Sequence, residues 1–164
     1  MFKSIESLKS HGFQGFHTVG ELISNTDLIP AEKGVYCVLR TKEAPPEFLE
    51  KGTGGYFKGK NPNVTLSELK ENWISGTPVL YIGKAGSSSG KSNLRKRIHQ
   101  YLRFGHGEDV GHYGGRLIWQ LKDAQDLLFC WKPILSDEPA VIESEIINTF
   151  RNMYGDRPFA NLRD

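Results

Sequence analysis

The stretch from Val79 to Tyr101, VLYIGKAGSSSGKSNLRKRIHQY, limits the folds open to this chain more than any other. It begins with a short apolar run typical of a strand, passes through a loop rich in glycine and serine, and continues as a basic helix from Leu94. Two kinds of site use a strand, a loop and a helix in this order. One is a loop that cradles the phosphates of a nucleotide, and the other is part of a nuclease active site.

Length and charge narrow the class of protein. A chain of 164 residues suits one domain, and 38% hydrophobic with 24% charged residues is typical of a globular protein. The net charge is only +2, so binding to a polyanion would depend on local clusters of basic residues.

The two cysteines, Cys37 and Cys130, lie in apolar runs and are expected to be reduced core residues. The first residues lack the apolar region of a signal peptide, and no apolar run approaches the roughly 20 residues that cross a bilayer. The cytoplasm is therefore the expected location, with no membrane partner.

Residues 1–30 are expected to form a helical extension, including a helix that starts near Thr18. The rest, 31–164, is expected to be the main domain. Its first strands are predicted at 34–40 and 78–84, joined by an irregular insert at about 42–77 that includes a short helix capped by Thr65. A connection of this kind favours antiparallel pairing.

Later elements complete the expected domain. A helix is predicted from about Asn93 to Phe104, followed by a glycine-rich loop over 105–115, strand candidates at 117–119 and 127–132, and a final helix. That helix is expected to have Asp137 as its N-cap and Pro139 in its first turn, and to run to about Met153. The fold class is α/β (α+β), with a small, mainly antiparallel sheet of about three strands flanked by helices.

Helical geometry places one carboxylate on the inner side of the last helix. At about 100° per residue, Glu143 falls within the arc of apolar side chains, whereas Glu145 falls on the polar side. A carboxylate on an apolar face is costly unless it is paired, hydrogen-bonded or metal-bound. Glu143 is therefore either a metal ligand or half of a structural ion pair with a core arginine.

The same geometry places Arg97 on the apolar side of the basic helix, where a guanidinium needs a planar anion such as a carboxylate or a phosphate. Tyr36 and Tyr81 lie on the two predicted strands. A carboxylate that holds a divalent ion, an arginine beside the phosphoryl oxygens and a tyrosine that activates water would together suit phosphodiester hydrolysis. Either tyrosine could be the base, and strand packing is the alternative role for both.

These residues belong to a longer pattern. Gly34-Val35-Tyr36 and Tyr81-Ile82-Gly83 resemble the two half-motifs of the GIY-YIG nuclease superfamily. Four further segments resemble that family's pattern in the same order: Gly83-Lys84-Ala85, Leu94-Arg95-Lys96-Arg97-Ile98, Glu143-Ser144-Glu145-Ile146-Ile147 and Pro158-Phe159-Ala160-Asn161. Together they extend from Gly34 to Asn161. The insert at 42–77, the loop at 86–92 and the gap from Glu143 to Asn161 are longer than is usual in the family.

The resemblance implies an endonuclease that cleaves DNA with one Mg²⁺ or Mn²⁺ ion bound by Glu143. It implies a set of catalytic residues: Tyr36, Tyr81, Lys84, Arg97, Tyr101 and Glu143. Asn161 would belong to the substrate site. Lys91, Arg95 and Lys96 are expected to contact the DNA backbone.

Two other functions remain open. Residues 85–92, AGSSSGKS, fit a relaxed phosphate-loop pattern, although no apolar strand ends in the aspartate that such proteins use for Mg²⁺. A nuclease fold could also serve as a non-catalytic DNA-binding module. His106, Glu108, Asp109 and His112 lie in the glycine-rich loop and are expected to be solvated rather than a metal site. Trp73, Trp119 and Trp131 are expected to pack in the core or at its edge.

Overall fold

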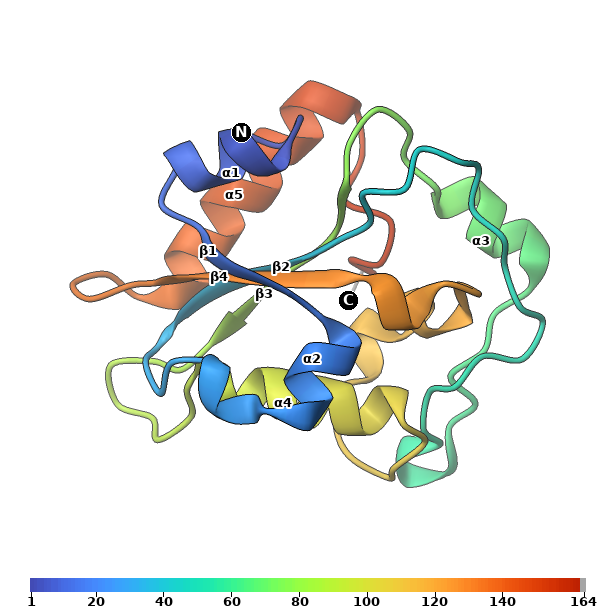
Figure 1. Cartoon of the computed structure of the whole chain (residues 1–164), viewed down its shortest axis with the longest axis horizontal. Helices are drawn as coiled ribbons and strands as arrows, with labels where there is room; N and C mark the ends of the chain where they lie inside the picture. Colours follow the sequence, from blue (N-terminus) through green and yellow to red (C-terminus); the bar gives the residue numbers. More distant parts are fainter. Residues whose placement is uncertain (163–164) are drawn as a thin grey trace.

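One antiparallel sheet organises residues 1–162, the part of the chain that the computed structural model describes (Figure 1). Its order is β1 (Gln14–Thr18), β4 (Leu128–Pro133), β2 (Gly34–Leu39) and β3 (Val79–Ala85). All three neighbouring pairs are antiparallel, so the fold is α+β. The mainly antiparallel sheet is confirmed, but with four strands instead of about three. The last two residues of the predicted 31–164 domain lie outside the described residues.

β2 and β3 form where the sequence predicts them. Every residue of β2 is buried, because β4 and β3 flank it and helices cover both faces. A strand that is buried on both faces has a continuous apolar sequence, and residues 34–40 have this pattern. In the β2–β3 register, Tyr36 pairs with Gly83 and Val38 pairs with Tyr81. The antiparallel pairing predicted for these strands is confirmed.

The N-terminal strand β1 was missed, since residues 1–30 were expected to be helical. It is an edge strand with an irregular register between Gly15 and His17, and Phe16 has a φ of 60°. A Cβ on Gly15 would lie 2.6 Å from the Trp131 ring, so glycine lets that indole lie across the strand. The bulge breaks the alternation of apolar and polar residues by which strands are recognised.

The strand predicted at 117–119 is wrong. These residues belong to η3 (Tyr113–Gln120), a 3₁₀ segment, and their side chains are all buried under the sheet. A short apolar run that is buried on all sides has no period that distinguishes a strand from a helical turn. The strand predicted at 127–132 is confirmed as β4.

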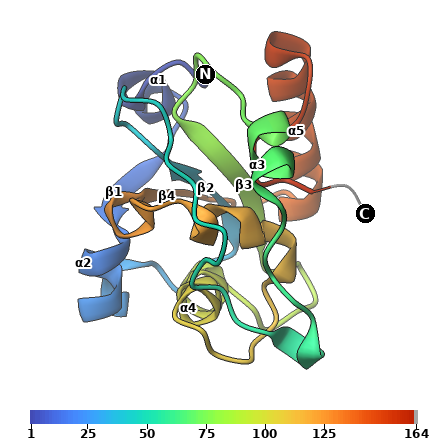
Figure 2. The ribbon, with the colours of Figure 1, turned by 90° about the vertical axis from the view of Figure 1, so that its right-hand side faces the viewer.

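Helices cover both faces of the sheet (Figure 1). α1 (Ile5–Ser10) and α5 (Pro139–Tyr154) lie on one face, and α2 (Val19–Ser24) and α4 (Leu94–Gly105) lie on the other. Figure 2 shows α5 beside the β3 edge of the sheet, and α3 (Leu66–Asn72) belongs to the long connection from β2 to β3. The remaining 3₁₀ segments are η1 (Thr26–Leu28), η2 (Phe57–Gly59) and η4 (Ala124–Asp126).

Helix capping follows the sequence closely, with one correction. The Thr65 and Asn93 side chains accept hydrogen bonds from the backbone amides of Glu68 and Lys96 at 3.1 and 2.9 Å. The N-cap of α5 is Glu138, not Asp137, and Pro139 opens the first turn. The Asp137 carbonyl lies outside the helix and accepts from the Lys33 ammonium at 3.0 Å.

Each face of the sheet has its own apolar core. The α4 side contains Tyr36, Tyr81 and Tyr101, and the α5 side contains Cys37 and Cys130, which pair across β2 and β4 as buried free thiols. Trp119 and Trp131 are buried and Trp73 is partly buried, as expected of packing residues. Within residues 1–162, no helix is long and apolar enough to span a membrane.

Candidate functional site

Gly83 is what allows Tyr36 and Tyr81 to lie side by side. It lies opposite Tyr36 in the sheet, and a Cβ there would come within 2.6 Å of the Tyr36 ring and 2.7 Å of the Tyr81 ring. With glycine in this position the two ring centroids are 5.9 Å apart. The second half-motif therefore has a physical reason for its glycine, because any side chain would displace one of the tyrosines.

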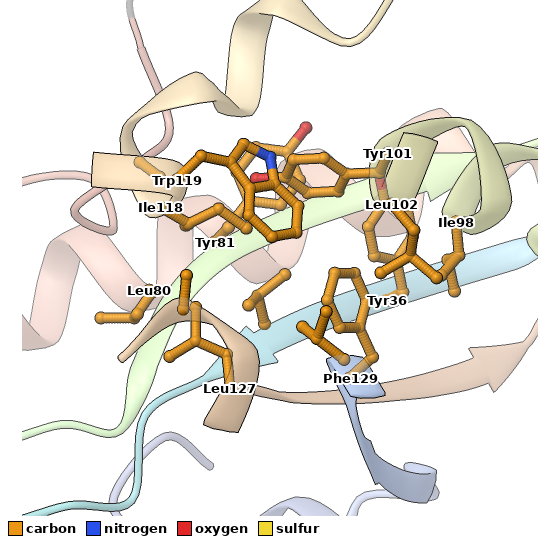
Figure 3. Packing of buried hydrophobic residues seen from close by; sticks show 14 of the residues in the cluster. Tyr36, Leu80, Tyr81, Ile98, Tyr101, Leu102, Ile118, Trp119, Leu127 and Phe129 are labelled. Carbon is orange, nitrogen blue, oxygen red and sulfur yellow. The ribbon is translucent and has the colours of Figure 1, made fainter. Parts of the chain in front are cut away.

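Tyr101 on α4 completes a cluster of three tyrosines (Figure 3). Its ring centroid is 5.3 Å from that of Tyr81 and 6.5 Å from that of Tyr36, both in edge-on geometry. Phe129 and Trp119 close the cluster, with centroids 5.7 and 5.6 Å from that of Tyr101. Three residues that are far apart in the sequence thus form one aromatic group on the α4 side of the sheet.

Burial sets the acidity of these hydroxyls. It raises the pKa of Tyr81 to about 12, with Glu143 adding to the rise and Arg97 opposing it. It also raises the pKa values of Tyr36 and Tyr101 well above their ordinary value. Tyr36 and Tyr101 have no exposed surface, whereas Tyr81 retains 9%. Of the three, Tyr81 is the hydroxyl that can meet a substrate or a water molecule.

His112 is the residue that sequence reasoning misplaced most clearly. It was expected to be solvated, but only 1% of it is exposed. Its imidazole stacks on the Tyr101 ring with centroids 3.6 Å apart, and its Nε2 lies 2.8 Å from the Tyr36 hydroxyl oxygen. The glycine-rich loop folds back over α4, so a segment that looks solvated in sequence contributes to the core.

Arg97 holds the same loop. Its guanidinium donates to the carbonyl oxygen of Gly111 at 3.0 Å and to the Gln100 side-chain oxygen at 2.9 Å. The side chain is partly buried, and its charge acts on the buried tyrosines of the α4 side, in agreement with the inward direction predicted for it. The partners seen are neutral oxygens, and the guanidinium influences all three tyrosines and His112 through its charge.

A cavity of about 370 Å³ lies where α5, the edge of β3 and the C-terminal segment meet. Tyr81 and Glu143 both line it, and so does Asn161. Glu143 is half-buried, whereas Glu145 on the other side of α5 is exposed, as the helical geometry predicted. The structure thus brings three of the predicted site residues to one cavity wall, with Tyr36, Tyr101 and Arg97 in the layer behind Tyr81.

Asn161 fastens the C-terminal segment to the free edge of β3. Its side-chain oxygen accepts from the Ile82 amide at 2.9 Å, and its side-chain nitrogen donates to the Ile82 carbonyl at 2.8 Å. The Ala160 amide donates to the Leu80 carbonyl at 2.8 Å. One side chain therefore satisfies both polar groups of an edge residue, and it also borders the cavity.

Two arginines at this cavity were not predicted. Arg151 and Arg157 line it together with Asn148 and Ser144. Arg151 lies eight residues after Glu143, and residues spaced by four lie on one face of a helix, so the sequence did contain that signal. Arg157 follows the helix end and carries no comparable signal; its guanidinium donates to the Leu162 carbonyl at 3.1 Å.

The other predicted basic residues lie away from this cavity. Arg95 donates to the Ile29 carbonyl at 2.7 Å and pairs with Asp27 at 3.8 Å. The Lys96 ammonium donates to the Lys91 carbonyl at 3.2 Å, on the exposed start of α4. Lys84 is exposed, and its charge lowers the pKa of Glu138 at the start of α5 after the larger effect of the Ser88 hydrogen bonds.

The cavity offers oxygen donors for a hard cation. Glu143 supplies a carboxylate, and Ser144 and Asn148 supply neutral oxygens on neighbouring turns. No group of three or more His, Cys, Asp or Glu side chains occurs within residues 1–162 that could hold a metal ion alone. Such a donor set fits Mg²⁺, which keeps several waters and binds through one or two carboxylates and substrate phosphates.

A larger cavity, of about 840 Å³, lies between the start of α1, the end of β2 and the segment after α3. Among the described residues that line it, none is a predicted site residue. The Arg40 guanidinium there is already paired with Asp123 at 2.9 Å and bonded to the Lys42 and Ala44 carbonyls. The smaller cavity is therefore the better candidate site, since it combines a carboxylate, a tyrosine and two arginines.

Comparison of the chain with protein-family models, with curated proteins and with solved structures returned no match.

Proposed function

We propose that this protein is a metal-dependent endonuclease that hydrolyses DNA phosphodiester bonds at the cavity formed by α5, β3 and the C-terminal segment. The observation that carries the proposal is the meeting of Tyr81 and Glu143 at one cavity wall, from a strand and a helix that are distant in sequence. A carboxylate and a hydroxyl at one wall suit the hydrolysis of a phosphodiester.

Each residue has a distinct part in this reaction. Because the pKa of Tyr81 is about 12, its hydroxyl is protonated at neutral pH and can hydrogen-bond the attacking water or a phosphate oxygen. The Arg97 charge acts on that hydroxyl from behind. Glu143 would hold the divalent ion, which when bound would polarise the phosphate and stabilise the leaving oxygen.

Arg151 and Arg157 give the cavity a positive end. Arg151 lies about 12 Å along α5 from Glu143, taking 1.5 Å per residue. Guanidinium groups bind phosphate in a planar, bidentate manner, so the two arginines suit a strand that extends from the cleavage position.

The phosphate-loop alternative has less support. Proteins with such a loop build it between a strand and a helix of a parallel βαβ unit, whereas the strand pairs within residues 1–162 are all antiparallel. The Ser88 amide in this loop also donates to the Glu138 carboxylate at 2.9 Å. That amide is thus already directed at an anion of the chain itself.

A cleavage assay with matched variants tests the proposal. Supercoiled plasmid is incubated with Mg²⁺ or Mn²⁺ and the wild type, Glu143→Gln, Glu145→Gln or Lys91→Ala. We expect the wild type to nick the plasmid and Glu143→Gln to abolish nicking, because the glutamine side chain lacks the anionic oxygen that would bind the metal ion. Glu145→Gln is the control from the exposed side of the same helix and should cleave like the wild type.

The outcomes separate the three functions. Equal cleavage by Glu143→Gln and wild type would refute the site. ATP binding that Lys91→Ala removes, without cleavage, would favour the phosphate loop. DNA binding without cleavage by the wild type under either metal would favour a non-catalytic binding module.

A further inference from the structure

The glycine-rich loop over 105–115 is attached at three points, one on Arg97 of α4 and two on the tyrosine cluster. Arg97 donates to the Gly111 carbonyl, Tyr101 donates to the Gly115 carbonyl, and His112 meets the Tyr36 hydroxyl. A Cβ on Gly115 would overlap the Tyr101 hydroxyl, so the loop approaches closely only because glycine is there. These contacts fix the imidazole of His112 in the layer behind the cavity.

The imidazole of His112 is kept neutral and has one polar partner. Burial lowers its pKa well below the ordinary value, and the Arg97 charge lowers it further. Its Nε2 lies 2.8 Å from the Tyr36 hydroxyl, while its buried Nδ1 meets no hydrogen-bond partner among residues 1–162. In one neutral tautomer Nε2 accepts the proton of the Tyr36 hydroxyl, and in the other Nε2–H donates to its oxygen, so Tyr36 is hydrogen-bonded in both.

Tyr36 in turn acts on Tyr81. The rings of Tyr36 and Tyr81 lie side by side with their centroids 5.9 Å apart, so a shift of Tyr36 would displace Tyr81. The contacts that lead from His112 through Tyr36 therefore end at Tyr81, which lines the cavity.

We propose that His112 is a positioning residue of the candidate site, which holds the Tyr36 side chain by its hydroxyl and, through the packing of Tyr36 beside Tyr81, the position of Tyr81 at the cavity wall. This inference rests on the proposed endonuclease function. It assigns a role to a loop residue outside the half-motifs, one that touches neither the metal nor the substrate.

Two substitutions separate the hydrogen bond from the ring stacking. His112→Phe keeps a ring on Tyr101 but removes the polar contact with Tyr36, and His112→Gln keeps a polar group without the ring. We expect His112→Phe to lower kcat for nicking roughly tenfold to a hundredfold, as is typical for partners that orient a reactive group, with KM unchanged. His112→Gln should restore part of that loss.

A double-mutant cycle with Tyr36→Phe tests the route of the effect. If His112 acts through Tyr36, the double variant His112→Phe/Tyr36→Phe should be no slower than Tyr36→Phe alone, because both changes break the same contact. Losses that multiply, or a change in KM with kcat intact, would overturn the inference while leaving the endonuclease proposal standing.

A measurement on the metal-free protein provides the readout that does not depend on cleavage. Imidazole ¹⁵N resonances should show that His112 stays neutral at a lower pH than an ordinary histidine does, and Tyr36→Phe should shift the His112 Nε2 resonance. A His112 Nε2 resonance that Tyr36→Phe leaves unchanged would refute the contact. If the contact is present but no cleavage depends on Glu143, the endonuclease proposal fails, and the positioning role fails with it.

Discussion

Replacing Asn161 by alanine should unfasten the C-terminal segment from β3 and destabilise the fold. Asn161 provides both hydrogen bonds that Ile82 makes to this segment, at 2.9 and 2.8 Å. Ile82 is fully buried, so its amide and carbonyl would lose their partners in a place with little access to water. The mutation therefore removes two bonds and leaves two polar groups without partners.

The expected cost follows from those two groups. A buried backbone group that loses its partner costs about 1–3 kcal/mol. Relaxation of the segment would admit some water, so we expect a loss of about 2–4 kcal/mol in the free energy of unfolding. For a chain of this size each kcal/mol shifts Tm by about 2–4 °C, which gives a decrease of about 5–15 °C.

Urea and thermal unfolding measure this loss directly. Asn152→Ala, an exposed asparagine on α5, is the control and should change the free energy by no more than about 0.5 kcal/mol. Asn161→Asp should lie between the wild type and the alanine variant, since the carboxylate still accepts from the Ile82 amide but cannot donate to its carbonyl. This order of stabilities is specific to a side chain that spans both groups.

One result would refute the reasoning. If Asn161→Ala unfolds like the wild type but loses cleavage, the side chain serves the substrate and not the sheet edge. If the cleavage activity of Asn161→Ala falls only in proportion to the fraction of the variant that is folded, the role of the side chain is structural. Both quantities come from the same protein preparation, so the two roles are separated by one set of measurements.

Three further predictions concern the site. Arg151→Ala should weaken DNA binding for all sequences alike and reduce the slope of log affinity against log salt by about 1, measured by fluorescence anisotropy. An unchanged slope would show that Arg151 does not contact a phosphate. Gly83→Ala should cost about 1–3 kcal/mol in urea unfolding, because the new Cβ comes within 2.6 Å of the Tyr36 ring; a neutral effect would contradict the close packing. Because the pKa of His112 is lowered in the folded protein, the unfolded chain takes up its proton first as pH falls. The free energy of unfolding should therefore fall below about pH 6.5 by up to about 1.4 kcal/mol per pH unit, and His112→Phe should remove that part of the slope.

Local patterns predicted the elements whose residues share one environment. Period and capping alone predicted the buried strands at 34–40 and 78–84, the capped helices at Thr65 and Asn93, and the inward side of Glu143. The edge strand β1 was not predicted, because its bulge and Gly15 break the alternation of apolar and polar residues. The apolar run at 117–119 was wrongly predicted as a strand, because all of its side chains are buried and a fully apolar run has no period that distinguishes a strand from a helical turn.

By itself the sequence determined which strands and helices carry Tyr36, Tyr81, Arg97 and Glu143, because spacing along a strand or helix fixes the face of each side chain. Only the tertiary structure decided which of them meet. It placed Tyr81 with Glu143 at a cavity and buried Tyr36 behind His112. It also directed Arg95 to Ile29 and Asp27 instead of that cavity. Contacts between distant segments depend on how a loop folds back over a helix, and a loop sequence has no period from which that path can be derived.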